Sequence, residues 1–291
     1  MQVEVRTIRG VPTGWLQQGR GSKSDPILFF IHGFPDMPQT WEAQIKFFSS
    51  AYLTIAPYAR GISPSEPENN STRFGMDSIV LDHLAILRHV DPSGCRPVVV
   101  IGHDIGAVHA WHFARLLQHR LHALVVINGT SLDQMVGRIG YIKQMLKSWY
   151  IAFFQLPFLP EWVMSQWGDS IFSRIRKRQG AVSTTAPAEI LIPMIEMYRQ
   201  VLRQAFFYRT SSYPKISSPT LILWGNKDPF LEIPSAVELR RICKSHTMRV
   251  LNGGHWIHEE QSDHVNNLIQ NFFEKNTMWR KTYAVRTHIS A

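Results

Sequence analysis

Short runs of branched and aromatic residues recur along the chain, and several are followed by a segment whose apolar residues have helical spacing. Continuous apolar runs of this length are typical of strands buried on both faces of a sheet. They lie at 26–31, 52–56, 98–101, 123–127, 219–225 and 247–251, with helices expected at about 40–48, 76–89 and 105–117. The segments 3–8 and 15–18 predict outer antiparallel strands. This alternation predicts an α/β fold with a mostly parallel, eight-stranded sheet covered by helices on both faces.

The alternation stops between residues 131 and 213. This part contains no strand-like run, only aromatic-rich helical pieces such as 149–154 and 194–207, interrupted by prolines. An insertion of this kind between two parallel strands predicts a helical cap over the carboxyl edge of the sheet. The expected domains are therefore a core formed by 1–130 and 214–291 and a cap formed by 131–213.

The strand at 98–101 runs into Gly102-His103-Asp104-Ile105-Gly106, which has the form Gly-x-nucleophile-x-Gly. In this motif the glycines permit a tight turn that projects the central side chain above the sheet, with a helix N-terminus beneath it. The centre of the motif is most often Ser. Here it is a carboxylate, that of Asp104.

Two further candidates follow later strands. Asp228 comes after the strand at 219–225, and His255 comes after the strand at 247–251. The carboxyl ends of parallel strands form the ligand crevice of open α/β sheets, so we expect Asp104, Asp228 and His255 to meet there. The order nucleophile, acid, histidine is that of the α/β-hydrolases.

These motifs, together with the loop His32-Gly33-Phe34-Pro35 and with Trp256 after His255, resemble the α/β-hydrolase superfamily over about residues 10–273. Within it, the chain resembles the epoxide hydrolases with an aspartate nucleophile and their relatives the haloalkane dehalogenases. The resemblance implies the α/β-hydrolase fold and assigns the oxyanion hole to the backbone N–H groups of Phe34 and Ile105. The side chain of His32 is expected to be structural. The loop at 58–61 reads Tyr-Ala-Arg-Gly instead of the family's Asp-x-Arg-Gly.

An aspartate nucleophile points to attack on a saturated carbon. A carboxylate is ionised at neutral pH and needs no base, and its attack on an sp3 carbon gives an ordinary ester that water can cleave. Attack on a carbonyl would give an unstable anhydride. We expect His255 to activate the water, and Asp228 to orient and stabilise the imidazolium.

The leaving group separates the two substrate classes. Dehalogenases hold halide with indole N–H groups, one of them from a Trp directly after the nucleophile, where this chain has Ile105. An opening epoxide develops an alkoxide and needs a donor such as Tyr. The resemblance assigns this role to two cap tyrosines, for which Tyr150 and Tyr198 are the best matches. The reserve candidates are Tyr141, Tyr208 and Tyr213.

The sequence therefore predicts hydrolysis of a lipophilic epoxide to a vicinal diol, with water as the second substrate and no metal or organic cofactor. A dehalogenase using the same three residues is the alternative, and a non-catalytic binding protein of this fold is a third possibility. The aromatic and Met residues between 144 and 167 predict a lipophilic pocket, although they are equally compatible with packing of the cap on the sheet.

Composition adds limits. The formal net charge is +9, but the basic residues form no long stripe, so nucleic acid is not an expected partner. The basic groups at 174–178 and 280–286 are interpreted as a solvated helix face and a loose tail. No apolar run reaches the ~20 residues of a membrane span and no secretory signal is recognised, so stable membrane insertion is not expected. Peripheral contact through Phe158, Leu159 and Trp162 is a minor alternative. Two distant cysteines suggest a reduced, cytoplasmic protein, monomeric or homodimeric.

Overall fold

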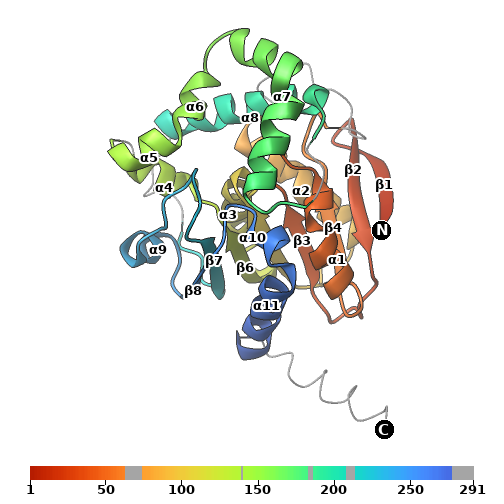
Figure 1. The fold of residues 1–291 in the computed structure, drawn as a ribbon. Helices are drawn as coiled ribbons and strands as arrows, with labels where there is room; N and C mark the ends of the chain where they lie inside the picture. The colour runs from red at the N-terminus through yellow and green to blue at the C-terminus, as the bar shows by residue number, and fades with distance from the viewer. Residues whose placement is uncertain (63–73, 139, 183–185, 208–213, 277–291) are drawn as a thin grey trace.

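The computed structural model describes residues 1–62, 74–138, 140–182, 186–207 and 214–276. Its centre is an eight-stranded mixed sheet with the order β1-β2-β4-β3-β5-β6-β7-β8 (Figure 1). Strand β2 is antiparallel to both β1 and β4, and the remaining neighbours are parallel. The predicted α/β architecture and strand number are confirmed.

The strands lie within a few residues of the predicted runs. They are β1 (Gln2–Ile8), β2 (Val11–Gln18), β3 (Ile27–Ile31), β4 (Leu53–Pro57), β5 (Val98–His103), β6 (Leu121–Ile127), β7 (Thr220–Gly225) and β8 (His246–Leu251). Strands β3, β4, β5 and β7 are buried along their whole length, whereas the edge strands β1 and β8 are largely exposed or half-buried. Continuous burial explains why the inner strands have unbroken apolar runs.

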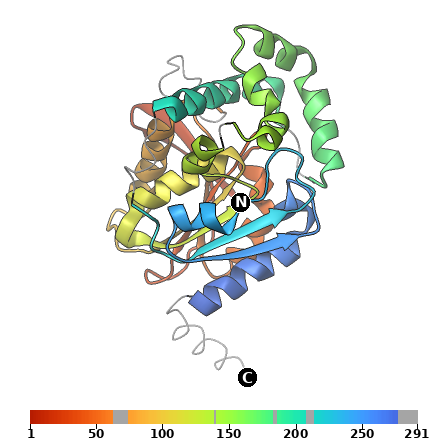
Figure 2. The same cartoon turned by 90° about the vertical axis from the view of Figure 1, so that its left-hand side faces the viewer.

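Helices cover both faces of the sheet. In Figures 1 and 2, α1 and α11 lie together on one face, and α2 and α3 lie together on the other. The bounds of the core helices are η1 (Pro38–Trp41), α1 (Glu42–Phe48), α2 (Met76–Val90), α3 (Ile105–Leu117), η3 (Gln118–Arg120), α9 (Ala236–Ile242), α10 (Ile257–Glu260) and α11 (Ser262–Asn276).

The chain between β6 and β7 is a helical insert that lies over the carboxyl edge of the sheet (Figure 1). It contains α4 (Leu132–Gly137), α5 (Ile142–Lys147), α6 (Trp149–Phe153), α7 (Leu159–Arg178) and α8 (Ala188–Phe207). The expected interruption of the helical pieces by prolines is present at Pro157 and Pro160, because α6 ends before Pro157 and Pro160 stands in the first turn of α7. The insert is thus confirmed, and the exact domain boundary at 131–213 stays a prediction.

The turn after β5 is tightly packed. Asp104 adopts a left-handed backbone conformation with a φ of 52°. A side chain at Gly106 would place its Cβ 2.3 Å from the carbonyl oxygen of His32, and one at Gly102 would lie 2.6 Å from Cβ of Ala110. The two motif glycines therefore let α3 pack directly against β5 and against the end of β3.

Among the described residues, no helix combines the length and the apolar character needed to cross a bilayer. Cys95 is exposed, Cys243 is buried, and both are free thiols. The predicted cytoplasmic location stays a prediction.

Replacing Gly106 by Ala is expected to lower the free energy of unfolding by about 1–3 kcal/mol, because the added methyl group meets rigid backbone. Urea unfolding followed by circular dichroism measures the change. Gly137→Ala is the matched control, since its Cβ would have no neighbour within 4 Å, and its effect is expected to stay within about 0.5 kcal/mol. Equal stability of the two variants would contradict the close packing of the turn.

Candidate active site

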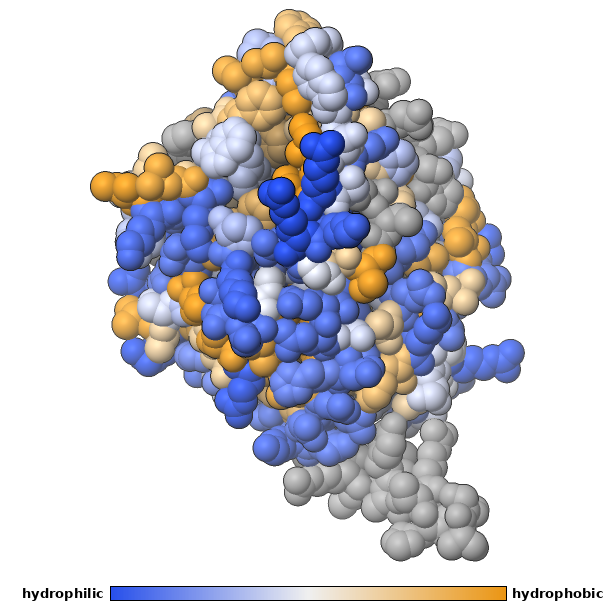
Figure 3. Space-filling view, viewed as in Figure 1, coloured by the Kyte–Doolittle hydropathy of each residue, from blue (hydrophilic) through white to orange (hydrophobic). Residues whose placement is uncertain are grey.

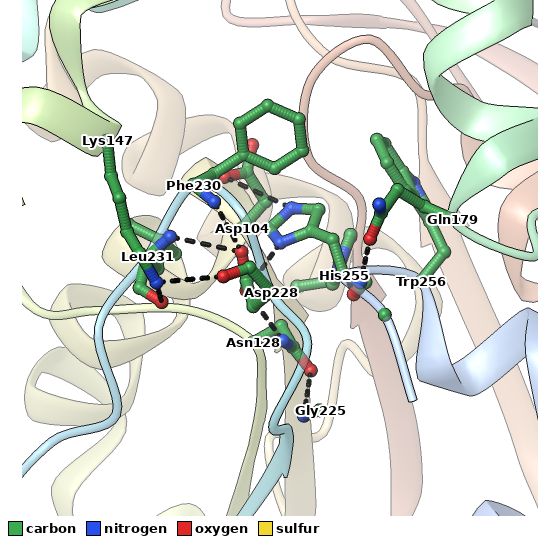
Figure 4. Close-up of polar contacts among 12 residues, drawn as sticks. Asp104, Asn128, Lys147, Gln179, Gly225, Asp228, Phe230, Leu231, His255 and Trp256 are labelled. Atoms are coloured by element: carbon green, nitrogen blue, oxygen red, sulfur yellow. Dashed lines mark hydrogen bonds and ion pairs between the residues drawn. The ribbon is translucent and has the colours of Figure 1, made fainter. Parts of the chain in front are cut away.

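Asp104, Asp228 and His255 converge above the carboxyl edge of the sheet (Figure 4). His255 Nδ1 lies 2.7 Å from Asp228 Oδ2, and His255 Nε2 lies 3.6 Å from Asp104 Oδ1. All three side chains are buried. The structure therefore brings together the three residues that the sequence placed at strand ends, with the imidazole between two carboxylates.

Asp228 is fixed by donors on every side. Its Oδ1 accepts hydrogen bonds from the backbone N–H groups of Phe230 (2.7 Å) and Leu231 (3.0 Å), and its Oδ2 accepts one from Asn128 Nδ2 (2.6 Å). Asn128 was missed by the sequence analysis, although its position directly after β6 is itself the carboxyl end of a strand. Asn128 also accepts from the N–H of Gly225, so it links the ends of β6 and β7.

The electrostatics favour a charged imidazole. Burial alone would lower the pKa of His255, but the carboxylates of Asp228 and Asp104 outweigh it and raise the pKa above 6.5. The reverse holds for Asp228, because burial would raise the pKa of its carboxyl group, whereas His255 and the N–H donors lower it below 3.8. The two groups stabilise each other as an ion pair.

Asp104 presents two different oxygens. Oδ2 accepts a hydrogen bond from the backbone N–H of Phe34 at 3.0 Å and one from the hydroxyl of Tyr198 at 3.3 Å. Oδ1 faces His255. Ile105 begins α3, so its backbone N–H belongs to the first turn of a helix, where such groups have no intrahelical partner.

The two cap tyrosines face each other above this carboxylate. Tyr150 comes from α6 and Tyr198 from α8, with ring centroids 5.8 Å apart and ring planes at 85°. Burial raises the pKa of both phenols, and the negative charge of Asp104 raises it further. Both hydroxyls are therefore held protonated. The reserve candidate Tyr141 lies exposed before α5, and the positions 208 and 213 are outside the described residues.

A cavity of about 230 Å³ lies between the insert and the sheet. Its lining comprises Phe34, Pro35, Asp104, Trp149, Tyr150, Phe153, Phe154, Val163, Met164, Ile171, Phe172, Ile175, Tyr198, Phe230, His255 and Trp256. The lining is apolar except for the carboxylate, the imidazole and the two phenols. The predicted lipophilic pocket is present, and several of its aromatic residues also contact one another across the insert and the core.

Comparison with known proteins gives the family. Residues 26–262 match the model of the alpha/beta hydrolase fold family. The chain belongs to this family.

Relatives of this α/β-hydrolase include epoxide hydrolases. Epoxide hydrolase 4 of Homo sapiens is 29% identical over 274 residues, which cover 88% of this chain and 75% of the human protein. The AB hydrolase superfamily protein YfhM of Bacillus subtilis is 29% identical over 272 residues, covering 87% of this chain and 92% of that protein. The resemblance to epoxide hydrolases drawn from the motifs is confirmed.

Solved structures agree on the fold. An epoxide hydrolase of Bacillus megaterium in complex with an inhibitor has a TM-score of 0.77 at 22% identity, covering 93% of this chain and all of that one. Epoxide hydrolase I of potato has a TM-score of 0.76 at 21% identity, covering 94% of this chain and all of that one.

The loop after β3 in this α/β-hydrolase is held by His32. Its Nε2 accepts from the backbone N–H of Ala59 at 3.2 Å, and its Nδ1 donates to the carbonyl of Gly33 at 3.0 Å. Burial lowers the pKa of His32 to about 4, so the ring is neutral and fastens two loops. In the loop at 58–61, which departs from the family pattern, Arg60 forms an ion pair with Asp82. These contacts give both residues a structural role.

A second buried cluster lies behind His255. Asp36, His103 and His258 bring their oxygen and nitrogen atoms within 4.8 Å of one another. His103 Nε2 donates to the carbonyl of His255 at 3.0 Å. Burial lowers the pKa of His103 to about 4 and that of His258 well below 6.5, so both rings are neutral. Neutral imidazoles and a carboxylate are metal-ligand types, but Asp36 already pairs with the guanidinium of Arg176, and this positive charge opposes a second cation.

Arg176 corrects one expectation. The basic residues 174–178 were interpreted as a solvated helix face, and Arg176 at the end of α7 is instead buried. Its guanidinium pairs with Asp36 and Glu259 and stacks over the ring of Trp256 at 5.0 Å. A run of basic residues in the sequence does not show that one of them is buried. Here it ties the insert to the segment that follows His255.

Replacing Asp228 by Asn is expected to lower the pKa of His255, because burial then opposes protonation without its main counter-charge. Titration of the imidazole nitrogens by NMR measures this, with the His255 signals assigned from their loss in His255→Gln. Asp263→Asn, an exposed carboxylate on α11, is the control and is expected to leave the titration unchanged. An unchanged pKa in Asp228→Asn would mean that the ion pair does not set the charge of His255.

Proposed function

We propose that the protein is an epoxide hydrolase that converts a lipophilic epoxide to a vicinal diol through an ester on Asp104. The observation that carries the proposal is that one apolar cavity receives a carboxylate from the core and two protonated phenols from the insert. The phenols suit an alkoxide leaving group and the carboxylate suits a saturated carbon. The named relatives support the same class.

In the first step, Oδ1 of Asp104 attacks a ring carbon while Phe34 N–H holds Oδ2. The carbon–oxygen bond of the ring breaks, and its electron pair stays on the former epoxide oxygen. Tyr150 and Tyr198 donate hydrogen bonds to this oxygen and one of them gives it a proton. Their raised pKa keeps the proton in place until the alkoxide forms.

In the second step, neutral His255 takes a proton from a water molecule, which adds to Cγ of the Asp104 ester. The N–H groups of Phe34 and Ile105 stabilise the oxyanion that develops at Oδ2. The bond between Cγ and Oδ1 then breaks, so the diol leaves with Oδ1 and Asp104 retains the water oxygen. The two water protons end on the leaving diol oxygen and on the phenolate, which restores the protein. Because His255 must be neutral, this step accelerates as the pH rises through the pKa of His255, which Asp228 still raises after the charge of Asp104 is lost in the ester.

A dehalogenase role is less well supported. Trp256 lines the cavity, but its indole N–H donates to Asp36 at 3.0 and 3.1 Å and is not directed at a leaving group. The position after Asp104 is occupied by Ile105, which has no N–H on its side chain. The phenols are the better donors facing this carboxylate.

The first test uses His255→Gln with styrene oxide. We expect the ester to form and its hydrolysis to slow by about 10²–10⁴-fold, so the peptide containing Asp104 gains the mass of the epoxide. In wild-type protein in oxygen-18 water, a single turnover should give unlabelled diol and label in Asp104, and later turnovers should release labelled diol.

Asp104→Asn is the matched control and is expected to give neither ester nor diol. Bromide release from 1-bromobutane without diol from styrene oxide would instead assign the protein to the dehalogenases. Label in the diol of the first turnover would exclude the ester.

The proton donors have their own test. Tyr150→Phe combined with Tyr198→Phe is expected to reduce ring opening by about 10²–10⁴-fold, since the alkoxide then lacks both donors. The rate of ester formation, followed by rapid quenching, measures this step directly. Tyr141→Phe removes a hydroxyl outside the cavity and is expected to react like wild type. Undiminished opening in the double variant would remove the phenols from the mechanism.

A further inference from the structure

Helix α5 carries its apolar residues on the outside. Ile142 is 71% exposed and Leu146 is 70% exposed, and Met145 and Trp149 are exposed as well. Positions 142, 145 and 146 lie on one face of α5, which itself has no buried residue, and Trp149 begins the next helix, α6. A helix on the surface of a globular protein normally turns such a face inward. Here it faces solvent.

The polar side of α5 explains this orientation, because it binds the core. Gln144 donates to the carbonyl of Phe230 at 3.0 Å and accepts from the N–H of Glu232 at 2.9 Å. Lys147 donates to the carbonyl of Asp228 at 2.9 Å and pairs with Glu232 at 3.0 Å. The helix is thus held in an inverted position by specific polar contacts, and the exposure of its apolar face is a fixed property of the fold.

The exposed apolar surface continues over the insert. Phe158, at the start of α7, is 84% exposed, and the exposed indoles of Trp162 and Trp167 pack edge to face at 5.1 Å. Figure 3 shows hydrophobic side chains along the outer edge of the insert, over α5 and over the turn between α6 and α7. We call Ile142, Met145, Leu146, Trp149, Phe158 and Trp162 the apolar ridge.

The ridge and the active-site cavity share one residue. Trp149 is 66% exposed and at the same time lines the cavity that contains Asp104. It also lines a second apolar cavity of about 260 Å³ between the insert and the core, to which Met145 contributes. The side chain of Trp149 therefore connects the ridge with the lining of both cavities.

The charge of the insert indicates what covers the ridge. Residues 131–213 contain ten Lys and Arg against five Asp and Glu. Of the ten basic residues, Arg138, Lys147, Arg176, Arg199 and Arg203 pair with carboxylates. Lys143 on α5 is exposed and stands next to Ile142, whereas the exposed basic residues of α7 lie at its far end, away from Phe158 and Trp162. Exposed apolar side chains beside a basic group, in a chain with a formal net charge of +9, match an anionic lipid surface, which offers both a hydrocarbon layer and negative headgroups.

We propose that the apolar ridge docks the protein on anionic lipid bilayers, with Trp149 against the hydrocarbon boundary. In this position a lipophilic substrate dissolved in the bilayer enters the cavity past Trp149 without crossing water. The argument for docking uses only the surface residues. The argument that substrate enters from the bilayer rests on the proposed function as well.

Flotation with vesicles of phosphatidylcholine, with and without phosphatidylserine, tests the docking in the absence of any epoxide. Wild-type protein is expected to float with the vesicles that contain phosphatidylserine. Ile142→Ser combined with Leu146→Ser should lower the partition coefficient by about tenfold, and Lys143→Glu should lower it by about fivefold. The matched controls are Val3→Ser with Val5→Ser, which remove exposed apolar residues from β1, and Lys244→Glu, which reverses an exposed charge before β8. They should bind like wild type.

Styrene oxide turnover in solution is measured in parallel and is expected to be unchanged in the Ile142/Leu146 double variant, since neither residue lines the active-site cavity. Vesicle binding by a protein that does not hydrolyse styrene oxide would leave the docking standing and reject the proposed function. The docking would be overturned if the wild-type protein binds neither type of vesicle. It would also be overturned if the double variant and its control bind equally well. The docking would also be overturned if the wild-type protein binds no vesicles and forms a dimer that the double variant does not form. That result would show that a second copy of the chain covers the ridge.

Discussion

The close approach of two loops at the centre of the sheet is the constraint on which the site depends. The turn at Asp104 is left-handed, and Gly106 brings the first turn of α3 against the backbone of His32. This contact is what sets the N–H of Phe34 3.0 Å from the carboxylate of Asp104. A bulkier turn would separate the nucleophile from the donor that must later stabilise its oxyanion. The tight turn at Asp104 therefore also determines how the nucleophile and its backbone donor are positioned.

The buried negative charge of the site acts on its imidazole and on both of its phenols. Asp104 and Asp228 raise the pKa of His255, and Asp104 helps burial to raise the pKa of Tyr150 and Tyr198. The effects act at different points of the proposed cycle. Protonated phenols favour ring opening, and the charge of Asp104 is lost when the ester forms, so its contribution to the pKa of His255 is absent when the imidazole must be neutral. The positive charge of Arg176 lowers the pKa of His255 and so favours the neutral imidazole that hydrolysis needs.

The sequence predicted most of what depends on strand periodicity. Buried strands have unbroken apolar runs, and the ends of those runs were enough to locate Asp104, Asp228 and His255. The tyrosines followed only from resemblance. Asn128 was missed although it stands at a strand end, because an Asn after a strand is also an ordinary turn residue. Arg176 and the inverted face of α5 could not be predicted, since periodicity shows that a helix has two faces and not which one is covered.

The contacts of α5 connect these features. Lys147 and Gln144 bind the backbone of the segment 228–232, whose first residue is the partner of His255. Tyr150 follows Lys147 by less than one helical turn, so the phenol and the acid are held to the same few residues. A movement of the insert away from the core would withdraw the phenol, whereas the Asp228 carboxylate would keep its donors in the core. The same polar contacts that place the phenol leave the apolar side of α5 on the surface.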